Sequence, residues 1–362
     1  MRVVLLGVIL AAEFVVLEIG LNASLESEAS SPFQTLFIQD SRIGYRPRPG
    51  AATTYSTAEF RTELRINGQG VRDDEEIGPK APDERRIVIL GDSLVLAVQV
   101  PLAETFGKRL EARLNDADRA HRWRVINAGV QGYGPVEDWL FFEHVVSAFQ
   151  PDIVIVTVFV GNDAVEASGA RTTLAAGRVP VVSVTDSAQA WLRRVIRYSQ
   201  VLQRVRVRID QLRSRLTASV PELPLASYLD NPPAAVTEGF DLARQAFGRI
   251  ADRADQEGAA TVFVLMPARF QIDDADFGRL DEAVSAAGGT LRRNLATERF
   301  LSALAPLGRP TLDLLPVLWA QDRRDELFFQ RNVHLTPRGH QVVADALFSF
   351  LETREPARVG RR

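Results

Sequence analysis

The stretch that decides the fold is "RRIVILGDSLVLAVQVP", which runs from Arg85 to Pro101. A short run of apolar, mostly β-branched residues stops at the turn-forming triplet Gly-Asp-Ser, and an apolar pattern with helical spacing follows. A strand, a tight turn and a helix in this order are typical of the start of a βαβ unit. Because the turn after a parallel strand opens at the carboxyl edge of the sheet, Ser93 is a candidate nucleophile as well as a turn residue.

Four later segments repeat this strand pattern, with helical patterns between them. Leu102, Phe106, Leu110 and Leu114 recur at every fourth position after Pro101, a residue that suits the first turn of a helix. The segment "FDLARQAFGRIADRA" has the same periodicity before the fourth strand. Five strands joined by crossover helices predict a parallel sheet covered on both faces. The predicted strand segments are "RIVIL", "WRVINA", "DIVIVTVFV", "ATVFVLM" and "PTLDLL".

Polar or glycine-rich loops follow the first three predicted strands. Ser93 follows the first strand, Gly129 to Gly134 the second, and Gly161-Asn162-Asp163 the third, so all three loops are expected at one edge of the sheet. Near the C-terminus, His334 precedes a helix expected to start around Thr336-Pro337. Neutral histidine can take the proton of an attacking serine, and backbone N–H groups or an asparagine amide can stabilise the oxyanion that forms. The chain therefore has the parts of a serine acyl-transfer site.

The composition argues against several other kinds of site. The 362-residue chain has a formal net charge of −3, so nothing indicates a nucleic-acid partner. With no cysteine there is no disulfide framework, thiolate metal site or thiol nucleophile. Only four histidines are present, so a metal centre would depend mostly on carboxylates, and we expect neither a metal nor another cofactor. Structural roles are expected for three of these histidines, namely His121, His144 and His340.

Four blocks of the sequence resemble the motifs of the SGNH (GDSL) hydrolases, in particular the membrane-anchored bacterial type. They are "GDSL" at Gly91 to Leu94, "NAGVQGYG" at Asn127 to Gly134, "GND" at Gly161 to Asp163 and "HLTPRGH" at His334 to His340. The resemblance implies an α/β fold, a flavodoxin-like three-layer α/β/α sandwich, and ester hydrolysis through an acyl-serine without a metal.

The same resemblance implies a role for each matched residue. Ser93 is the expected nucleophile and His334 the expected base. The expected oxyanion hole consists of the Ser93 N–H, the Gly132 N–H and the side chain of Asn162.

One departure from the family pattern concerns the acid that orients the histidine. Members usually place an aspartate two or three positions before it, where this chain has Asn332 and Arg331. An asparagine oxygen can accept the imidazole N–H but brings no charge, and the same exchange in a serine-protease triad lowers turnover by about four orders of magnitude. Three alternatives stay open: a Ser-His dyad held by a backbone carbonyl, a replacement acid such as Asp325 or Asp322, or a weakened enzyme that mainly binds.

The N-terminal region is expected to form two parts that precede the hydrolase domain. The apolar stretch from Val3 to Leu21 predicts a membrane anchor over residues 1–22, with a cleaved signal peptide or a buried helix as alternatives. Arg2 favours a hydrolase domain outside the cytoplasm, in the periplasm or at the cell surface. Residues 23–84 are expected to form a linker and a small β-containing preface, in which "FRTELRINGQGVRDDEE" looks like the preface of membrane-anchored bacterial members.

Within the hydrolase domain, expected over residues 85–355, an amphipathic insertion is predicted at about residues 187–217. Apolar residues from Trp191 to Leu216 recur at spacings of four and three, with arginines between them. A lid or flank of the domain is the first interpretation of this helix. A dimer coil and a helix on a membrane surface are the alternatives.

The sequence thus predicts a serine ester hydrolase that acts on a carboxylic ester, either an O-acetyl group or a lipid-like acyl chain on a carbohydrate or lipid. An O-acyltransferase with a sugar acceptor would use the same serine chemistry. The non-enzymatic alternative is a weakened homologue that acts as an envelope binding protein. The oligomeric state stays open.

Overall fold

The structure is a computed structural model and describes residues 35–169, 225–330 and 332–354. These residues all belong to one compact unit. The predicted anchor at residues 1–22, the predicted amphipathic helix at about residues 187–217 and Arg331 lie outside the described residues. Among the helices that are described, none has the length and apolar character needed to cross a membrane.

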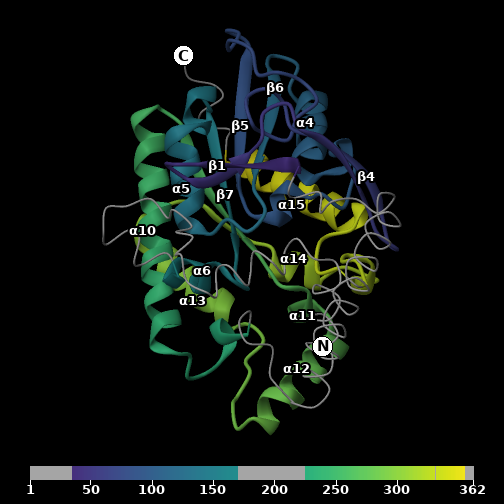
Figure 1. Cartoon of the computed structure of the whole chain (residues 1–362), viewed down its shortest axis with the longest axis vertical. Coiled ribbons are helices and arrows are strands. Elements are labelled where there is room, and N and C mark those ends of the chain that lie inside the picture. The colour runs from purple at the N-terminus through teal and green to yellow at the C-terminus, as the bar shows by residue number, and fades with distance from the viewer. Residues whose placement is uncertain (1–34, 170–224, 331, 355–362) are drawn as a thin grey trace, which may run out of the picture. The chain divides into compact units, whose positions relative to one another are not determined.

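A five-stranded parallel sheet forms the centre of the described chain (Figure 1). Its strands are β5 (Glu84–Gly91), β6 (Arg122–Gly129), β7 (Ile153–Phe159), β8 (Ala260–Met266) and β9 (Thr311–Asp313). They lie in the order β6-β5-β7-β8-β9, which is the flavodoxin-like order when the strands of this sheet are counted along the chain. The prediction of a parallel sheet from five apolar segments is therefore confirmed.

Side chains along each strand alternate between two separate cores, so both faces of the sheet are covered. On β5, Val88 and Leu90 belong to one core, whereas Ile87 and Ile89 belong to the other. Helices α5 (Pro135–His144), α6 (Asp163–Gly169), α10 (Ala234–Gln256) and α13 (Leu295–Leu304) cover the first face. Helices α4 (Phe106–Ala117), α14 (Leu315–Trp319) and α15 (Pro337–Arg354) cover the second. Figure 1 shows α5, α6 and α10 gathered on one side of the sheet, which makes a three-layer α/β/α arrangement.

Two antiparallel hairpins precede the sheet in the chain. Strand β1 (Phe37–Asp40) pairs with β2 (Gly44–Pro47), and β3 (Ala52–Ser56) pairs with β4 (Arg61–Arg65). After them, Arg72 forms an isolated bridge with a residue of β6. The remaining short elements are α3 (Ser93–Leu96), η1 (Leu102–Glu104), η2 (Val146–Phe149), η3 (Ala226–Tyr228), α11 (Arg269–Ile272), α12 (Asp274–Ala286), η4 (Ala305–Leu307) and η5 (Arg324–Glu326).

The helix expected after Pro101 begins later than predicted. Pro101 instead precedes the single turn η1, and α4 begins at Phe106. Thr105 ends the first turn because its backbone is extended and its hydroxyl accepts a hydrogen bond from the Lys108 N–H, as an N-cap residue does. The N–H of Phe106 is satisfied by Nδ1 of His340 at 3.2 Å, so this buried histidine has the expected structural role.

The contact between α6 and α10 leaves no room for a side chain. A Cβ atom on Gly239, in α10, would lie 1.8 Å from the backbone oxygen of Ala164, in α6. The glycine therefore fixes how closely the two helices approach. This approach matters for the site because α6 starts directly after Asn162.

We predict opposite effects for alanine at two helical glycines. Gly239→Ala forces α6 and α10 apart and should lower the free energy of unfolding by about 1–3 kcal/mol. Gly278→Ala, in the exposed part of α12 where a Cβ meets nothing within 4 Å, should raise it by about 0.5–1 kcal/mol. Urea denaturation of the two variants provides the measurement. Equal changes in both variants would contradict the proposed close approach.

Candidate active site

Ser93 lies directly after β5, at the point where the strand order reverses direction. The chain crosses from β5 to β6 on one side and then returns to β7 on the other, so the carboxyl ends of β5 and β7 form the switch point at which such sheets usually bind ligands. Ser93 starts the short helix α3, and the Asp92 side chain caps it by accepting a hydrogen bond from the Leu94 N–H at 2.8 Å. Gly91 makes the sharp turn with φ +148°, where a Cβ would lie 2.7 Å from the Val95 side chain. The turn thus places the serine at this switch point.

His334 meets Ser93 from the loop before α15. Its Nε2 lies 2.7 Å from the Ser93 Oγ, and its Nδ1 lies 2.5 Å from the Oδ1 of Asn332. An amide oxygen can only accept hydrogen bonds, so Nδ1 bears the proton and Nε2 has the free lone pair. The Asn332 oxygen also accepts the backbone N–H of His334 at 3.2 Å, which fixes the loop. In this tautomer the imidazole can accept the serine proton.

Asn332 therefore orients the histidine in place of a backbone carbonyl or a replacement acid, and the alternative of a weakened enzyme stays open. The side chain of Gln330 donates to the backbone oxygen of Asp325, and the side chain of Arg338 donates to the backbone oxygen of Asp322. Neither bond involves a carboxylate. Within the described residues, no hydrogen bond joins either carboxylate to His334. The prediction of a replacement acid is wrong for both residues because their side chains do not reach the ring. The partner of the His334 ring is also not a backbone carbonyl but the side-chain amide of Asn332.

The environment of His334 favours its neutral form. Burial lowers the pKa of the imidazole to about 4, and the neutral amide of Asn332 supplies no negative charge to oppose this effect. The ring is thus unprotonated and able to act as a base at neutral pH. The imidazolium that forms during attack on an ester, however, receives no charge stabilisation from its partner.

Two of the three expected oxyanion donors are backbone N–H groups without a partner. Neither the Ser93 N–H nor the Gly132 N–H donates a hydrogen bond to another described residue. Gly132 has φ +73°, a left-handed conformation that favours glycine. The loop around it is held by Tyr45, in β2, whose hydroxyl donates to the Gln131 oxygen at 2.7 Å. The Tyr133 hydroxyl in turn donates to the Tyr45 backbone oxygen.

Asn162, the third expected donor, lies in the loop after β7 as predicted, but its amide is already engaged. Its Nδ2 donates to the Oε1 of Glu166 at 2.8 Å, whereas its Oδ1 is buried without a hydrogen-bond partner in the described chain. No motif pointed to Glu166 in the sequence. The structure identifies it because Glu166, on the first turn of α6, contacts Asn162, which directly precedes the helix.

Arg72, from the segment after the hairpins, holds the chain that follows Ser93. Its guanidinium donates to the backbone oxygens of Leu96, Ala97 and Val100 at 2.6 to 2.7 Å. Only 1% of this residue is exposed. One buried side chain thus donates to three carbonyl groups, of which that of Ala97 also accepts from the Val100 N–H at 3.2 Å. Sequence reasoning missed Arg72 because nothing in its local pattern shows that it will be buried.

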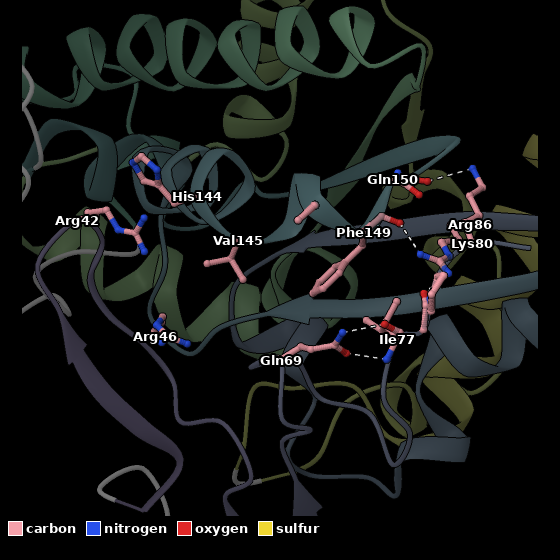
Figure 2. Close-up of a pocket in the computed structure, with 13 residues that line it drawn as sticks. Arg42, Arg46, Gln69, Ile77, Lys80, Arg86, His144, Val145, Phe149 and Gln150 are labelled. Carbon is pink, nitrogen blue, oxygen red and sulfur yellow. Dashed lines mark hydrogen bonds between the residues drawn. The ribbon is translucent and has the colours of Figure 1, made fainter.

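Figure 2 shows a cavity of about 750 Å³ that lies away from these residues. It lies between the hairpin segment and the end of α5, and Arg86, near the amino end of β5, contributes to its wall. Three of its cations are paired with acids: Arg46 with Asp40, Lys80 with Asp152, and Arg86 with Glu84. Because Ser93 follows the opposite end of β5, this cavity is not the reaction site.

One family model matches part of this chain. A family model described as an SGNH hydrolase-like domain, acetyltransferase AlgX, matches residues 230–361, a range that includes His334 but not Ser93 or Asn162. The curated proteins contain no sequence match to this chain.

Several solved structures are similar to the chain at low sequence identity. A lipase/acylhydrolase from Enterococcus faecalis is 14% identical over 75% of this chain and 96% of its own, with a TM-score of 0.43. LAE5, an alpha/beta hydrolase from the metagenome of Lake Arreo, is 12% identical over 75% and 96%, with a TM-score of 0.42. The acetyl xylan esterase AlAXEase is 14% identical over 73% and 98%, with a TM-score of 0.41. The described chain has an α/β fold with a five-stranded parallel sheet, and residues 230–361 are similar to the SGNH hydrolase-like family model.

We predict that Asn332→Asp raises the pKa of His334. In the wild type the ring should titrate near pH 4, and a carboxylate at Nδ1 should move this midpoint upward because it stabilises the imidazolium. NMR titration of the ring resonances measures both values. Gln330→Glu, which adds the same charge at an exposed position in the same loop, is the control and should have a much smaller effect. A wild-type midpoint near 6.5, or no upward shift in Asn332→Asp, would contradict the burial and the contact described above.

Proposed function

We propose that this protein transfers the acyl group of a carboxylic ester onto Ser93. The observation that supports this most strongly is the 2.7 Å contact between the Ser93 Oγ and the lone-pair nitrogen of His334. In the first step the serine oxygen attacks the ester carbonyl while its proton moves to Nε2. The tetrahedral intermediate then expels the alcohol, which takes the proton from the imidazolium, and an acyl-serine remains.

Stabilisation of the tetrahedral intermediate is assigned to three donors. The N–H groups of Ser93 and Gly132 have no described partner and are available to the oxyanion. The amide of Asn162 supplies the third donor. Preorganised donors of this kind typically contribute about 3–4 kcal/mol each to the rate when they are removed singly. They therefore compensate in part for the missing charge beside His334.

Ester hydrolysis and acyl transfer differ only in the second step. Water, or the hydroxyl group of a sugar, attacks the acyl-serine, and His334 accepts the proton of the attacking group and returns one to the Ser93 oxygen. Hydrolysis of an O-acetyl or lipid-like acyl ester is the first candidate. Acetyl transfer to a sugar hydroxyl is the second candidate, and the acetyltransferase named in the matching family model favours it.

The proposed location is the outer face of a membrane, with residues 1–22 as an uncleaved anchor. The apolar stretch from Val3 to Leu21 and Arg2 before it support this orientation. A secreted protein released by signal cleavage is the alternative. Mass spectrometry of the mature protein distinguishes the two, and a chain that begins after residue 22 would exclude the anchor.

We predict that the wild type releases nitrophenol from nitrophenyl acetate and that Ser93→Ala reduces this rate to the background. Ser285→Ala, an exposed serine in α12, is the matched control and should leave the rate unchanged. Added oligosaccharide distinguishes the two candidate reactions, since mass spectrometry then detects either free acetate alone or acetylated sugar. Equal rates for wild type and Ser93→Ala would exclude both reactions and leave the envelope binding protein as the interpretation.

A further inference from the structure

The amide of Asn162 and the carboxyl group of Glu166 form a buried pair beside the proposed oxyanion hole. One contact between them is direct, from Asn162 Nδ2 to Glu166 Oε1 at 2.8 Å. Each group also has one oxygen left over: Asn162 Oδ1 and Glu166 Oε2 are both buried, and neither has a hydrogen-bond partner among the described residues. Two buried acceptors without donors are costly when they are left in this state.

A single proton would satisfy both leftover oxygens if Glu166 Oε2 faces Asn162 Oδ1. Amide and carboxyl groups are planar, and each presents two polar atoms at a similar spacing, so two such groups can pair edge to edge. If Glu166 is protonated on Oε2, that O–H can donate to Asn162 Oδ1 while Nδ2 continues to donate to Oε1. An ionised carboxylate has no hydrogen to donate and leaves Oδ1 unpaired. The pair is therefore complete only when Glu166 is neutral.

We propose that Glu166 is a positioning residue that acts as a neutral acid, locking the Asn162 amide with two hydrogen bonds so that its second Nδ2–H remains available to the oxyanion. The inference rests on the proposed function, in which Asn162 is an oxyanion donor. Two bonds between planar groups remove the rotation of the amide about its side chain. A donor held in this way needs no reorganisation when the oxyanion forms.

The groups that face Glu166 favour the neutral form. Burial first, and then the neighbouring acids Asp92 and Glu137, raise the pKa of Glu166 to about 8. Asp163 on its own helix and Asp138 on α5 interact with it as further acids, and their pKa values are raised as well. The Tyr45 hydroxyl from β2 also interacts with Glu166. No cation contributes to the pKa of Glu166 in the described chain, so nothing compensates for a charge there.

Ionisation of Glu166 should therefore lower the activity at alkaline pH. As the pH rises through about 8, the Oε2 proton is lost, one of the two bonds to Asn162 breaks, and a negative charge appears beside the forming oxyanion. All three changes act against the tetrahedral intermediate. The rate should fall as a single ionisation on the alkaline side.

The test compares pH profiles of kcat for wild type, Glu166→Gln, Glu166→Ala and Glu137→Gln, each corrected with Ser93→Ala at the same pH. Glutamine reproduces the neutral pair at every pH, because its amide N–H donates to Asn162 Oδ1 and its oxygen accepts from Nδ2. Glu166→Gln should keep at least a third of the wild-type kcat at pH 7 and lose the alkaline decline. Glu166→Ala should lose kcat at least tenfold. Glu137→Gln, a buried neighbour whose carboxylate accepts from Gly134 N–H instead, should keep the decline.

Two outcomes would overturn the proposal: an unchanged alkaline decline in Glu166→Gln, or a loss of kcat in that variant as large as in Glu166→Ala.

An independent measurement separates failure of the positioning role from failure of the proposed function. The Asn162 side-chain N–H resonances, followed by NMR in Ser93→Ala, should shift with a midpoint near pH 8, and Glu166→Gln should abolish the shift. If they do not titrate, the positioning role fails. If the Asn162 resonances titrate but the wild type shows no esterase activity, only the proposed reaction fails.

Discussion

The parallel pairing of β5 with β7 is the constraint on which the whole site depends. Because these neighbouring strands run in the same direction, the loops that follow them open at the same edge of the sheet. Ser93 and Asn162 are far apart in sequence, yet they lie at this edge for that reason alone. His334 reaches the same edge because α15, which packs on the second face of the sheet, begins three residues after it.

The electrostatic arrangement of the site differs from that of a charged triad. At the histidine, the partner is the neutral Asn332, and burial keeps the imidazole unprotonated. At the oxyanion side, the carboxyl groups of Asp92, Asp138 and Glu166 are buried. Burial raises all three pKa values, and neighbouring acids raise those of Asp138 and Glu166 further. Asp92, whose pKa burial raises to about 6, is ionised at neutral pH, whereas the higher pKa values of Asp138 and Glu166 favour their neutral forms. At the histidine, the neutral Asn332 supplies no charge that would stabilise the imidazolium.

The segment before the sheet is part of this site rather than an appendage. Arg72 ties down the chain after Ser93, and Tyr45 holds the loop that presents the Gly132 N–H. These contacts of Arg72 and Tyr45 are with the backbone and not with an ester bound at Ser93. Arg72 donates to backbone carbonyl groups after Ser93, and Tyr45 donates to the partly buried carbonyl group of Gln131. The first hairpin and the segment after the second hairpin thus hold the loops of the nucleophile and of one oxyanion donor.

The sequence by itself determined the sheet, the order of the loops and the identity of the serine and histidine, because apolar periodicity and turn-forming glycines are local signals that persist in the fold. It also showed that an asparagine stands where an acid is usual. Only the tertiary structure decided that Asn332 contacts the ring while Asp325 does not, and that Arg72, Tyr45 and Glu166 support the site. For Arg72 and Tyr45 the physical reason is that their contacts join distant segments. Asn332 and Glu166 contact residues two and four positions away, and there the burial of the polar atoms decides which of them pair. A residue's own neighbours in the chain do not reveal which of its polar atoms will be removed from water.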